Sequence, residues 1–224
     1  MYDIVFISYQ EPSADENYAA LKARFPMAKR VHGVKGIHQA HIKAAKKCFT
    51  KMFWIVDADA IIMDNFNFDY VVPDHQLDHV HVWRAKNPIN GLEYGYGGVK
   101  LFPRQMTIDM DTSKTDMTTS ISSKFIAVEE TANITAFNTD AFSTWRSAFR
   151  ECAKLSSKTI LRQNDEETET RLNIWCTKGS ERRCGDFAIA GAIAGREFGL
   201  SNMADISLIN NFEWLHEQFS KHTI

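Results

Sequence analysis

The sequence predicts an α/β fold with a Rossmann-like sheet flanked by helices, followed by a helical C-terminal region. Two observations carry this prediction. Apolar runs alternate with helix-like segments over the first 57 residues, which is typical of a doubly wound parallel sheet. The final third has helix-like spacing of its large apolar residues. With 224 residues, 44% of them apolar and 24% charged, the composition excludes a disordered, collagen-like or low-complexity protein.

The first five elements follow from apolar spacing and from signals at their ends. We expect strands over residues 3–9, 28–31 and 52–56, and helices over 13–25 and 37–49. Ser13 and Glu16 have the spacing of a capping box at the start of the first helix, and Pro26 ends it. Ligands of such sheets bind where parallel strands end, so the residues after these strands are candidates for a site.

Later elements are less regular. We expect strands over residues 79–84 and 99–102, a tight turn over 95–98, and a long helix from Asp140. The buried side of this helix is formed by Phe142, Trp145, Phe149 and Cys152. We expect one domain over residues 1–224, divided into two parts near residue 103. No apolar stretch is long enough to span a bilayer, and residues 1–7 are typical of a strand and not of a signal peptide, so a cytoplasmic protein is expected. The spacing of the four cysteines predicts reduced thiols.

Charge is distributed unevenly along the chain. The formal net charge is −2, yet residues 17–56 contain nine Lys or Arg and no Asp or Glu. This segregation indicates a face that meets a polyanion, or a solvated lysine face that acidic loops balance.

Asp57 and Asp59 are the strongest chemical signal. They lie one residue apart, directly after the apolar run 52–56. Two carboxylates beside an apolar run are costly unless a cation compensates them. A hard divalent ion, Mg²⁺ or Mn²⁺, that also takes phosphate oxygens fits this role. The alternative is a pair of exposed loop aspartates.

At these residues the sequence resembles the GT-A fold glycosyltransferases, whose DxD motif follows a hydrophobic strand and holds a metal against a nucleotide-sugar diphosphate. The resemblance implies a mixed GT-A sheet, with residues 1–103 binding the nucleotide sugar and 104–224 forming the acceptor side. It also implies that the metal stabilises the departing nucleoside diphosphate, with UDP as the expected nucleotide.

The resemblance extends to further donor-side residues. It implies that Ser8, Tyr9 and Glu11 cradle the nucleotide, and that Ala58 lies between the two metal ligands at the donor. Two glycines flank Lys35 before the second predicted helix, so Lys35 is a candidate diphosphate contact, with His41 as a helper. His41 is otherwise a plain surface histidine. Gly97 and Gly98 would lie beneath the sugar, with Tyr94 or Tyr96 as a wall.

Three carboxylates are candidates for acid or base catalysis on the acceptor side. Asp116, Glu129 and Glu130 stand at about the distance past the DxD where GT-A enzymes place such groups, although the Glu-Asp pair of that family is not reproduced. A base must lie within hydrogen-bond reach of the acceptor hydroxyl.

A second resemblance covers most of the chain. Residues 8–12, 30–38, 87–90, 95–104 and 145–153 are similar to glycosyltransferase-like proteins of T4-like tailed bacteriophages. Such phages glycosylate 5-hydroxymethylcytosine in their own DNA, which implies DNA as acceptor and the host cytoplasm as location. Arg146, Arg150 and Lys154 recur at helical spacing and are candidate phosphate contacts.

The sequence therefore predicts a metal-dependent hexosyl- or pentosyltransferase. The alternatives are a GT-A transferase with a glycan or small-molecule acceptor, and a non-catalytic GT-A-like binding module. A phosphotransferase of the haloacid dehalogenase type is disfavoured, because that family carries its DxD on the first strand.

Overall fold

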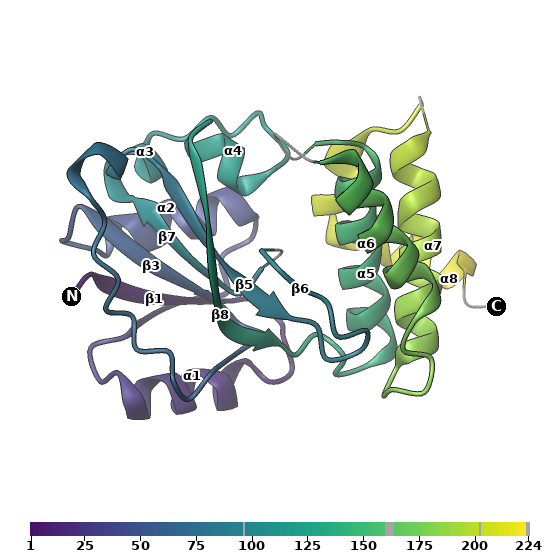
Figure 1. Ribbon diagram of the computed structural model, residues 1–224, viewed down its shortest axis with the longest axis horizontal. Coiled ribbons are helices and arrows are strands. Elements are labelled where there is room, and N and C mark those ends of the chain that lie inside the picture. The colour runs from purple at the N-terminus through teal and green to yellow at the C-terminus, as the bar shows by residue number, and fades with distance from the viewer. Residues whose placement is uncertain (96, 160–163, 202, 223–224) are drawn as a thin grey trace. The chain divides into compact units, whose positions relative to one another are not determined.

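The computed structural model describes residues 1–95, 97–159, 164–201 and 203–222 (Figure 1). The expected Tyr96 wall therefore lies outside the described residues. The chain forms two compact units, which we treat separately. Unit 1 comprises Met1–Lys86 and Glu93–Ala136, and unit 2 comprises Asn87–Leu92 and Phe137–Ile224. Unit 1 extends to Ala136 because the long strand before this residue belongs to its sheet. The division into donor-side and acceptor-side parts near residue 103 stays a prediction.

Unit 1 is built on a mixed sheet, which confirms the predicted α/β class. Its strands are β1 (Asp3–Ser8), β2 (Lys29–His32), β3 (Met52–Asp57), β4 (Ala60–Ile62), β5 (Val80–Lys86), β6 (Glu93–Tyr94), β7 (Val99–Pro103) and β8 (Phe125–Thr135). Among the described residues they form one sheet in the order β2-β1-β3-β7-β5-β8-β4, with β6 paired to β5. β2, β1 and β3 are mutually parallel, whereas β7 is antiparallel to β3 and to β5.

The helices of unit 1 pack on the two faces of this sheet. They are α1 (Ala14–Arg24), α2 (Ile37–Lys46), α3 (Arg104–Ile108), α4 (Met117–Ile121) and the short 3₁₀ helix η1 (Asp74–Gln76). The core on one face includes Leu21 of α1, and the core on the other includes Ala44 and Ala45 of α2. Because side chains alternate along a strand, β3 sends Trp54 to the first face and Ile55 to the second.

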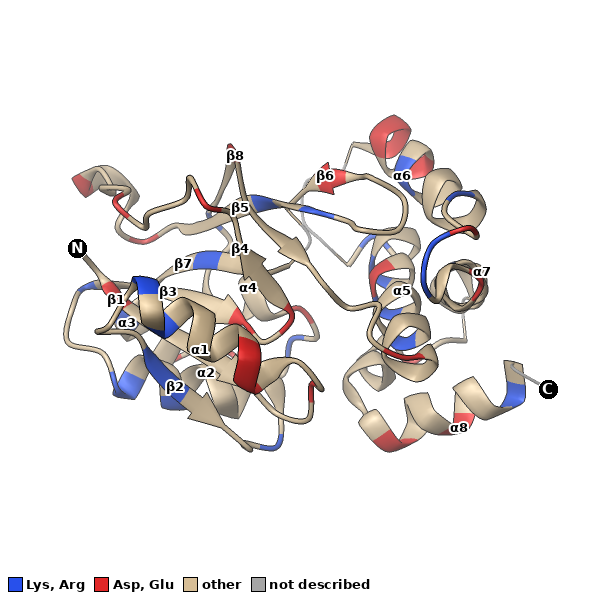
Figure 2. Ribbon diagram, turned by 90° about the horizontal axis from the view of Figure 1, so that it is seen from below, with Lys and Arg blue, Asp and Glu red and all other residues tan. Residues whose placement is uncertain are grey.

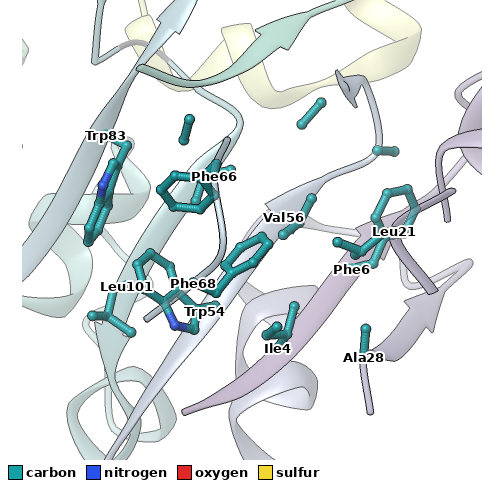
Figure 3. Close-up of a cluster of buried hydrophobic side chains, with 14 of the residues drawn as sticks. Ile4, Phe6, Leu21, Ala28, Trp54, Val56, Phe66, Phe68, Trp83 and Leu101 are labelled. Atoms are coloured by element: carbon teal, nitrogen blue, oxygen red, sulfur yellow. The ribbon is translucent and has the colours of Figure 1, made fainter. Parts of the chain in front are cut away.

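Aromatic side chains fill the α1 face (Figure 3). The ring centroids of Trp54 and Trp83 lie 4.5 Å apart, and those of Trp54 and Phe68 lie 5.2 Å apart in an edge-to-face arrangement. Phe66 and Phe68 come from the segment after β4, so this segment closes the core without regular structure. Such rings bury large areas and fix strand β3, which carries the candidate site at its end.

The predicted early elements agree with the structure within a few residues, with one correction. Helix α1 begins at Ala14, but the Ser13 side chain makes no capping hydrogen bond. Ser13 has φ −92° and ψ 8°, outside the extended conformation that an N-cap side chain needs to reach back to the helix amides. The capping-box prediction is therefore wrong, although the helix start is right.

Unit 2 is helical, as predicted for the C-terminal region. Its elements are α5 (Ala141–Ser156), α6 (Asp165–Thr177), α7 (Gly185–Leu200), the 3₁₀ helix η2 (Ile206–Asn210) and α8 (Phe212–His222). Asp140 caps α5 by accepting a hydrogen bond from the Ser143 N–H. Acidic residues occupy the first turn of α6, where they complement the helix dipole (Figure 2).

Within the described part of the chain, the structure contains no helix with the length and apolar character needed to cross a bilayer. All four cysteines are free thiols, as predicted.

Candidate active site

The candidate site lies at the edge of the sheet where the parallel strands of unit 1 end. Ser8 of β1 pairs in register with His32 of β2, and Ile7 of β1 pairs with Asp57 of β3. The three strands therefore end together, as the sequence predicted. This is the edge at which open α/β sheets bind their ligands.

Ser8 and His32 form a small polar network at the ends of β1 and β2. The Ser8 Oγ lies 2.9 Å from His32 Nδ1 and accepts a hydrogen bond of 2.9 Å from Arg30 Nε. Arg30 also pairs with Asp15 at 2.7 Å. Ser8 is buried and His32 is exposed. The network therefore fixes the end of β1 and presents an imidazole to solvent.

The loop after β1 is folded on itself. The Tyr9 N–H donates to the Glu11 carboxylate at 2.6 Å, which positions this carboxylate against the loop backbone. Tyr9 and Glu11 are both partly exposed. Their contact with a nucleotide stays a prediction.

The carboxylate of Asp57 has two different sides. Its Oδ2 accepts a hydrogen bond of 3.0 Å from the Gly98 N–H and lies 2.7 Å from the Lys100 ammonium. Among the described residues, no hydrogen-bond donor reaches its Oδ1. The Asp57 side chain is 31% exposed and that of Lys100 is 13% exposed. Oδ2 is therefore held by two donors, while the side chain as a whole stays partly accessible to solvent.

Electrostatics keep Asp57 ionised. Burial would raise the pKa of this carboxyl, but the Lys100 ammonium and the Gly98 N–H outweigh it and lower the pKa below its usual value. Sequence reasoning did not single out Lys100. The available signal was a lysine within the apolar run 99–102, because a buried strand tolerates such a charge only beside a partner.

His41 is a buried neighbour of this pair, and the expectation of a surface histidine is wrong. Its ring packs on Phe102 with a centroid separation of 5.9 Å, and its Nδ1 lies 2.8 Å from the Ile37 carbonyl oxygen. Its Nε2 is buried without a hydrogen-bond partner. Burial lowers the pKa of His41 to about 4, against the smaller opposing effect of Asp57. The imidazole is therefore neutral at pH 7.

The glycine turn before β7 folds over Asp57. Gly98 has φ +83°, and a Cβ at this position would lie 2.2 Å from the Asn133 side chain. A Cβ on Gly97 would lie 4.0 Å from Asp57 Oδ2. Gly98 must therefore be glycine to bring its N–H onto Asp57. The predicted place of Gly97 and Gly98 beneath a sugar stays a prediction.

The turn that carries Ala58 and Asp59 is held from two directions. The Ala58 carbonyl accepts a hydrogen bond of 2.8 Å from Asn17 of α1, and the Asp59 carbonyl accepts one of 2.6 Å from the Ala136 N–H. Ala58 is buried, and Asp59 is partly exposed. The backbone of the DxD segment is thus fixed by α1 and by the segment after β8.

A divalent cation fits this carboxylate pair only with outside ligands. In the part of the chain that the structure describes, no group of three or more His, Cys, Asp or Glu side chains is placed to hold a metal ion. The Asp57 and Asp59 carboxylates would supply oxygen ligands to such an ion. Mg²⁺ and similar hard ions are often held by one or two carboxylates together with substrate phosphates and water. The residues present fit that kind of site.

The start of α2 has the glycine geometry that the sequence indicated. Gly33 and Gly36 have φ values of +70° and +92°, and Gly36 precedes α2 without a side-chain cap. Lys35 is exposed between them. His38 Nε2 lies 3.1 Å from the Ser120 Oγ of α4. The role of Lys35 as a diphosphate contact stays a prediction.

The three predicted acid or base carboxylates do not gather at one point. Asp116 caps α4, accepting hydrogen bonds from the N–H groups of Thr118 and Thr119 at 3.0 Å each. Glu129 and Glu130 are exposed on β8, where Glu129 pairs with Arg84 at 3.2 Å and Glu130 accepts a hydrogen bond of 3.1 Å from Trp83. Capping explains Asp116 structurally, and catalysis by any of the three stays a prediction.

The predicted phosphate contacts of α5 are engaged within unit 2. The Arg146 guanidinium stacks on the rings of Phe142 and Phe212. Arg150 donates to the Ile209 carbonyl at 2.8 Å, and Lys154 pairs with the buried Glu151 at 2.9 Å. These contacts dock η2 and α8 and satisfy a buried carboxylate, which explains the helical spacing of the three cations without a nucleic acid.

Comparisons with known proteins give similarity in structure only. No protein-family model matches the chain, and no curated protein matches its sequence. Among solved structures, it is similar to the mannosyltransferase PcManGT from Pyrobaculum calidifontis, solved with GDP-Man and Mn²⁺, at 9% identity and a TM-score of 0.44 over 99% of this chain and 84% of that one. S. aureus TarS is matched at 10% identity and a TM-score of 0.42, over 99% of this chain and 54% of TarS.

Proposed function

We propose that the protein is a glycosyltransferase that takes its sugar from a nucleoside diphosphate and transfers it to a hydroxyl acceptor. The observation that carries the proposal is the Asp57 carboxylate at the end of β3, with Oδ2 held by Lys100 and Gly98 and with Asp59 two residues further along the chain. A bound Mn²⁺ or Mg²⁺ would supply Lewis-acid stabilisation of the leaving diphosphate.

The chain's own residues divide the remaining work. Asp57 and Asp59 hold the cation, and Lys35 meets the diphosphate near the start of α2. Ser8, Tyr9 and Glu11 receive the nucleotide, UDP in the first instance, beyond the end of β1. Ala58, Gly97 and Gly98 let the donor approach the backbone closely. His41 is a buried, neutral neighbour of Asp57 and Lys100. A hydroxyl is deprotonated by Glu129 or Glu130 in this proposal.

Donor binding tests the proposal directly. We expect the melting temperature to rise with UDP or another nucleoside diphosphate only when Mn²⁺ is present, because a ligand that binds only the folded state stabilises it. Asp59→Asn should lose the metal-dependent rise. Asp64→Asn makes the same charge change on an exposed loop residue and should keep it. An unchanged shift in Asp59→Asn, or no shift of the wild type with any nucleotide, would overturn the donor assignment and favour a non-catalytic binding module.

For the acceptor we propose 5-hydroxymethylcytosine in DNA as the first candidate to test. Its support in this chain is the basic segment of unit 1, which includes three exposed lysines, Lys43, Lys46 and Lys51. Incubation with a labelled sugar donor and duplexes with or without the hydroxymethyl group measures transfer. Absence of duplex binding at low salt contradicts this acceptor and leaves a glycan or small-molecule hydroxyl.

A further inference from the structure

A lysine beside the metal-binding carboxylates is an unexpected component of this site. Lys100 lies on β7, which is antiparallel to β3 and pairs Lys100 with Ile55. Ile55 and Asp57 are two residues apart on one strand, so their side chains and that of Lys100 share one face of the sheet. The short contact between Lys100 and Asp57 is therefore set by strand register.

The burial of Lys100 limits the groups that its ammonium can contact. Its side chain is 13% exposed, and its ammonium lies 2.7 Å from Asp57 Oδ2. The same oxygen also accepts the Gly98 N–H. The Asp57 and Lys100 pair is electrically neutral, so Asp57 contributes little net negative charge to the site while Lys100 is present.

We infer that Lys100 is a positioning residue that holds Asp57 by one oxygen and, by its charge, keeps the nucleotide-free protein from binding a divalent cation tightly. The affinity of a carboxylate site for such a cation rises with the number of uncompensated negative charges. The diphosphate of the donor supplies the missing charge. Cation and donor then bind with positive coupling, each raising the affinity for the other. This inference rests on the proposed function for its donor.

Removal of the charge tests the inference without turnover. Lys100→Gln keeps a hydrogen-bond donor toward Asp57, and Lys100→Met keeps the length of the side chain without the donor. Free Mn²⁺, followed by its electron paramagnetic resonance signal, reports binding to the nucleotide-free protein. We expect both variants to bind Mn²⁺ at least about tenfold more tightly than the wild type, because a unit charge a few ångströms from the ion is removed. Lys100→Arg keeps the charge and should keep the weak affinity.

Comparison of the three Lys100 variants separates charge from packing. Lys100→Gln and Lys100→Met differ in packing and share the loss of charge, so both should gain Mn²⁺ affinity, whereas Lys100→Arg should not. Thermal unfolding without metal identifies a variant that does not fold. Lys100→Gln is a milder change than Lys100→Met because it keeps a hydrogen-bond donor. An unchanged Mn²⁺ affinity in a folded Lys100→Gln protein overturns the inference.

The result is distinguishable from failure of the proposed function. Tighter Mn²⁺ binding by Lys100→Gln, together with no nucleotide binding by the wild type, supports charge compensation and contradicts the donor assignment. Metal-dependent nucleotide binding by the wild type, with no change of Mn²⁺ affinity in Lys100→Gln, supports the donor assignment and overturns the role of Lys100.

Discussion

Asp3 shows how one carboxylate joins two segments that are far apart in the sequence. It pairs with Lys29 at 2.6 Å and accepts hydrogen bonds from the N–H groups of Phe49 and Thr50 at 2.6 and 3.0 Å. Burial alone would raise the pKa of Asp3, but these partners lower it to about 2. The ionised side chain thus connects the start of β1 to β2 and to the loop before β3.

Replacement of Asp3 tests this connection. A carboxyl whose pKa is lowered in the folded state stabilises that state above its unfolded pKa, and the contribution is lost as pH falls through the folded value. We expect Asp3→Asn to lower the free energy of unfolding by about 2 kcal/mol at pH 7. Urea unfolding should show the difference shrinking between about pH 4 and pH 2. A pH-independent difference would contradict the role of the charge.

At the same scale, the sequence predicted only part of the site. Asp57 and Asp59 could be recognised as candidates because they directly follow an apolar run, so the local sequence pattern was sufficient to predict them. Lys100 is 43 residues from Asp57 along the chain, and its contact depends on the antiparallel register of β3 and β7. The burial of His41 likewise depends on Phe102 of β7. Nothing local in the sequence specifies such pairings.

Among the helices, α5 and α7 pack at unusually close range. A Cβ on Gly191 would lie 2.3 Å from the Trp145 carbonyl oxygen, and one on Gly195 would lie 2.2 Å from the Phe149 carbonyl oxygen. Both distances are far below normal contact, and both involve backbone that cannot rotate away. The two glycines therefore allow the α7 backbone to lie directly on α5.

Gly195→Ala tests this packing. An alanine in a helix gains about 1 kcal/mol over glycine, whereas overpacking costs about 1 to 3 kcal/mol and more where backbone must move. We expect the clash to dominate, with a net loss of at least about 1 kcal/mol in the free energy of unfolding. Glu197→Ala, on the exposed side of α7, serves as control and should change little. A Gly195→Ala protein more stable than the wild type would refute the close approach.

The elements themselves were predictable to different degrees. The alternation of strands and helices as far as β3 could be predicted because each of these strands is an apolar run with a clear end. Strand β8 was not predicted. The charged residues Glu129 and Glu130 interrupt its apolar pattern, and its pairing with β5 shifts register next to Trp83 and Arg84. A strand with such an irregularity lacks the strict alternation on which sequence reasoning depends.

The molecule as a whole should be sensitive to acid through two histidines of unit 1. Burial lowers the pKa of both His41 and His81 to about 4. Each is protonated in the unfolded chain near its ordinary value of 6.5, so the unfolded state binds more protons between these two values. Stability therefore falls as pH decreases from about 6.5 to about 4.

We expect the free energy of unfolding to fall by about 2 kcal/mol for each histidine between pH 7 and pH 5. Denaturant titrations at several pH values measure the total, and hydrogen exchange assigns the loss to unit 1. His81→Gln should remove about half of it. An equal pH dependence in this variant and the wild type would contradict a buried neutral His81.

The path of the chain between the two units has a consequence for dissecting the protein. The chain leaves unit 1 after Lys86, contributes Asn87–Leu92 to unit 2, returns at Glu93, and enters unit 2 again at Phe137. Ile89 packs so closely on Gly179 that a Cβ on that glycine would lie 2.4 Å from it. A recombinant fragment cut at residue 137 would therefore lack a piece of its own interior, so a design that separates the two units must graft residues 87–92 onto the helical fragment and bridge the resulting gap between β5 and β6.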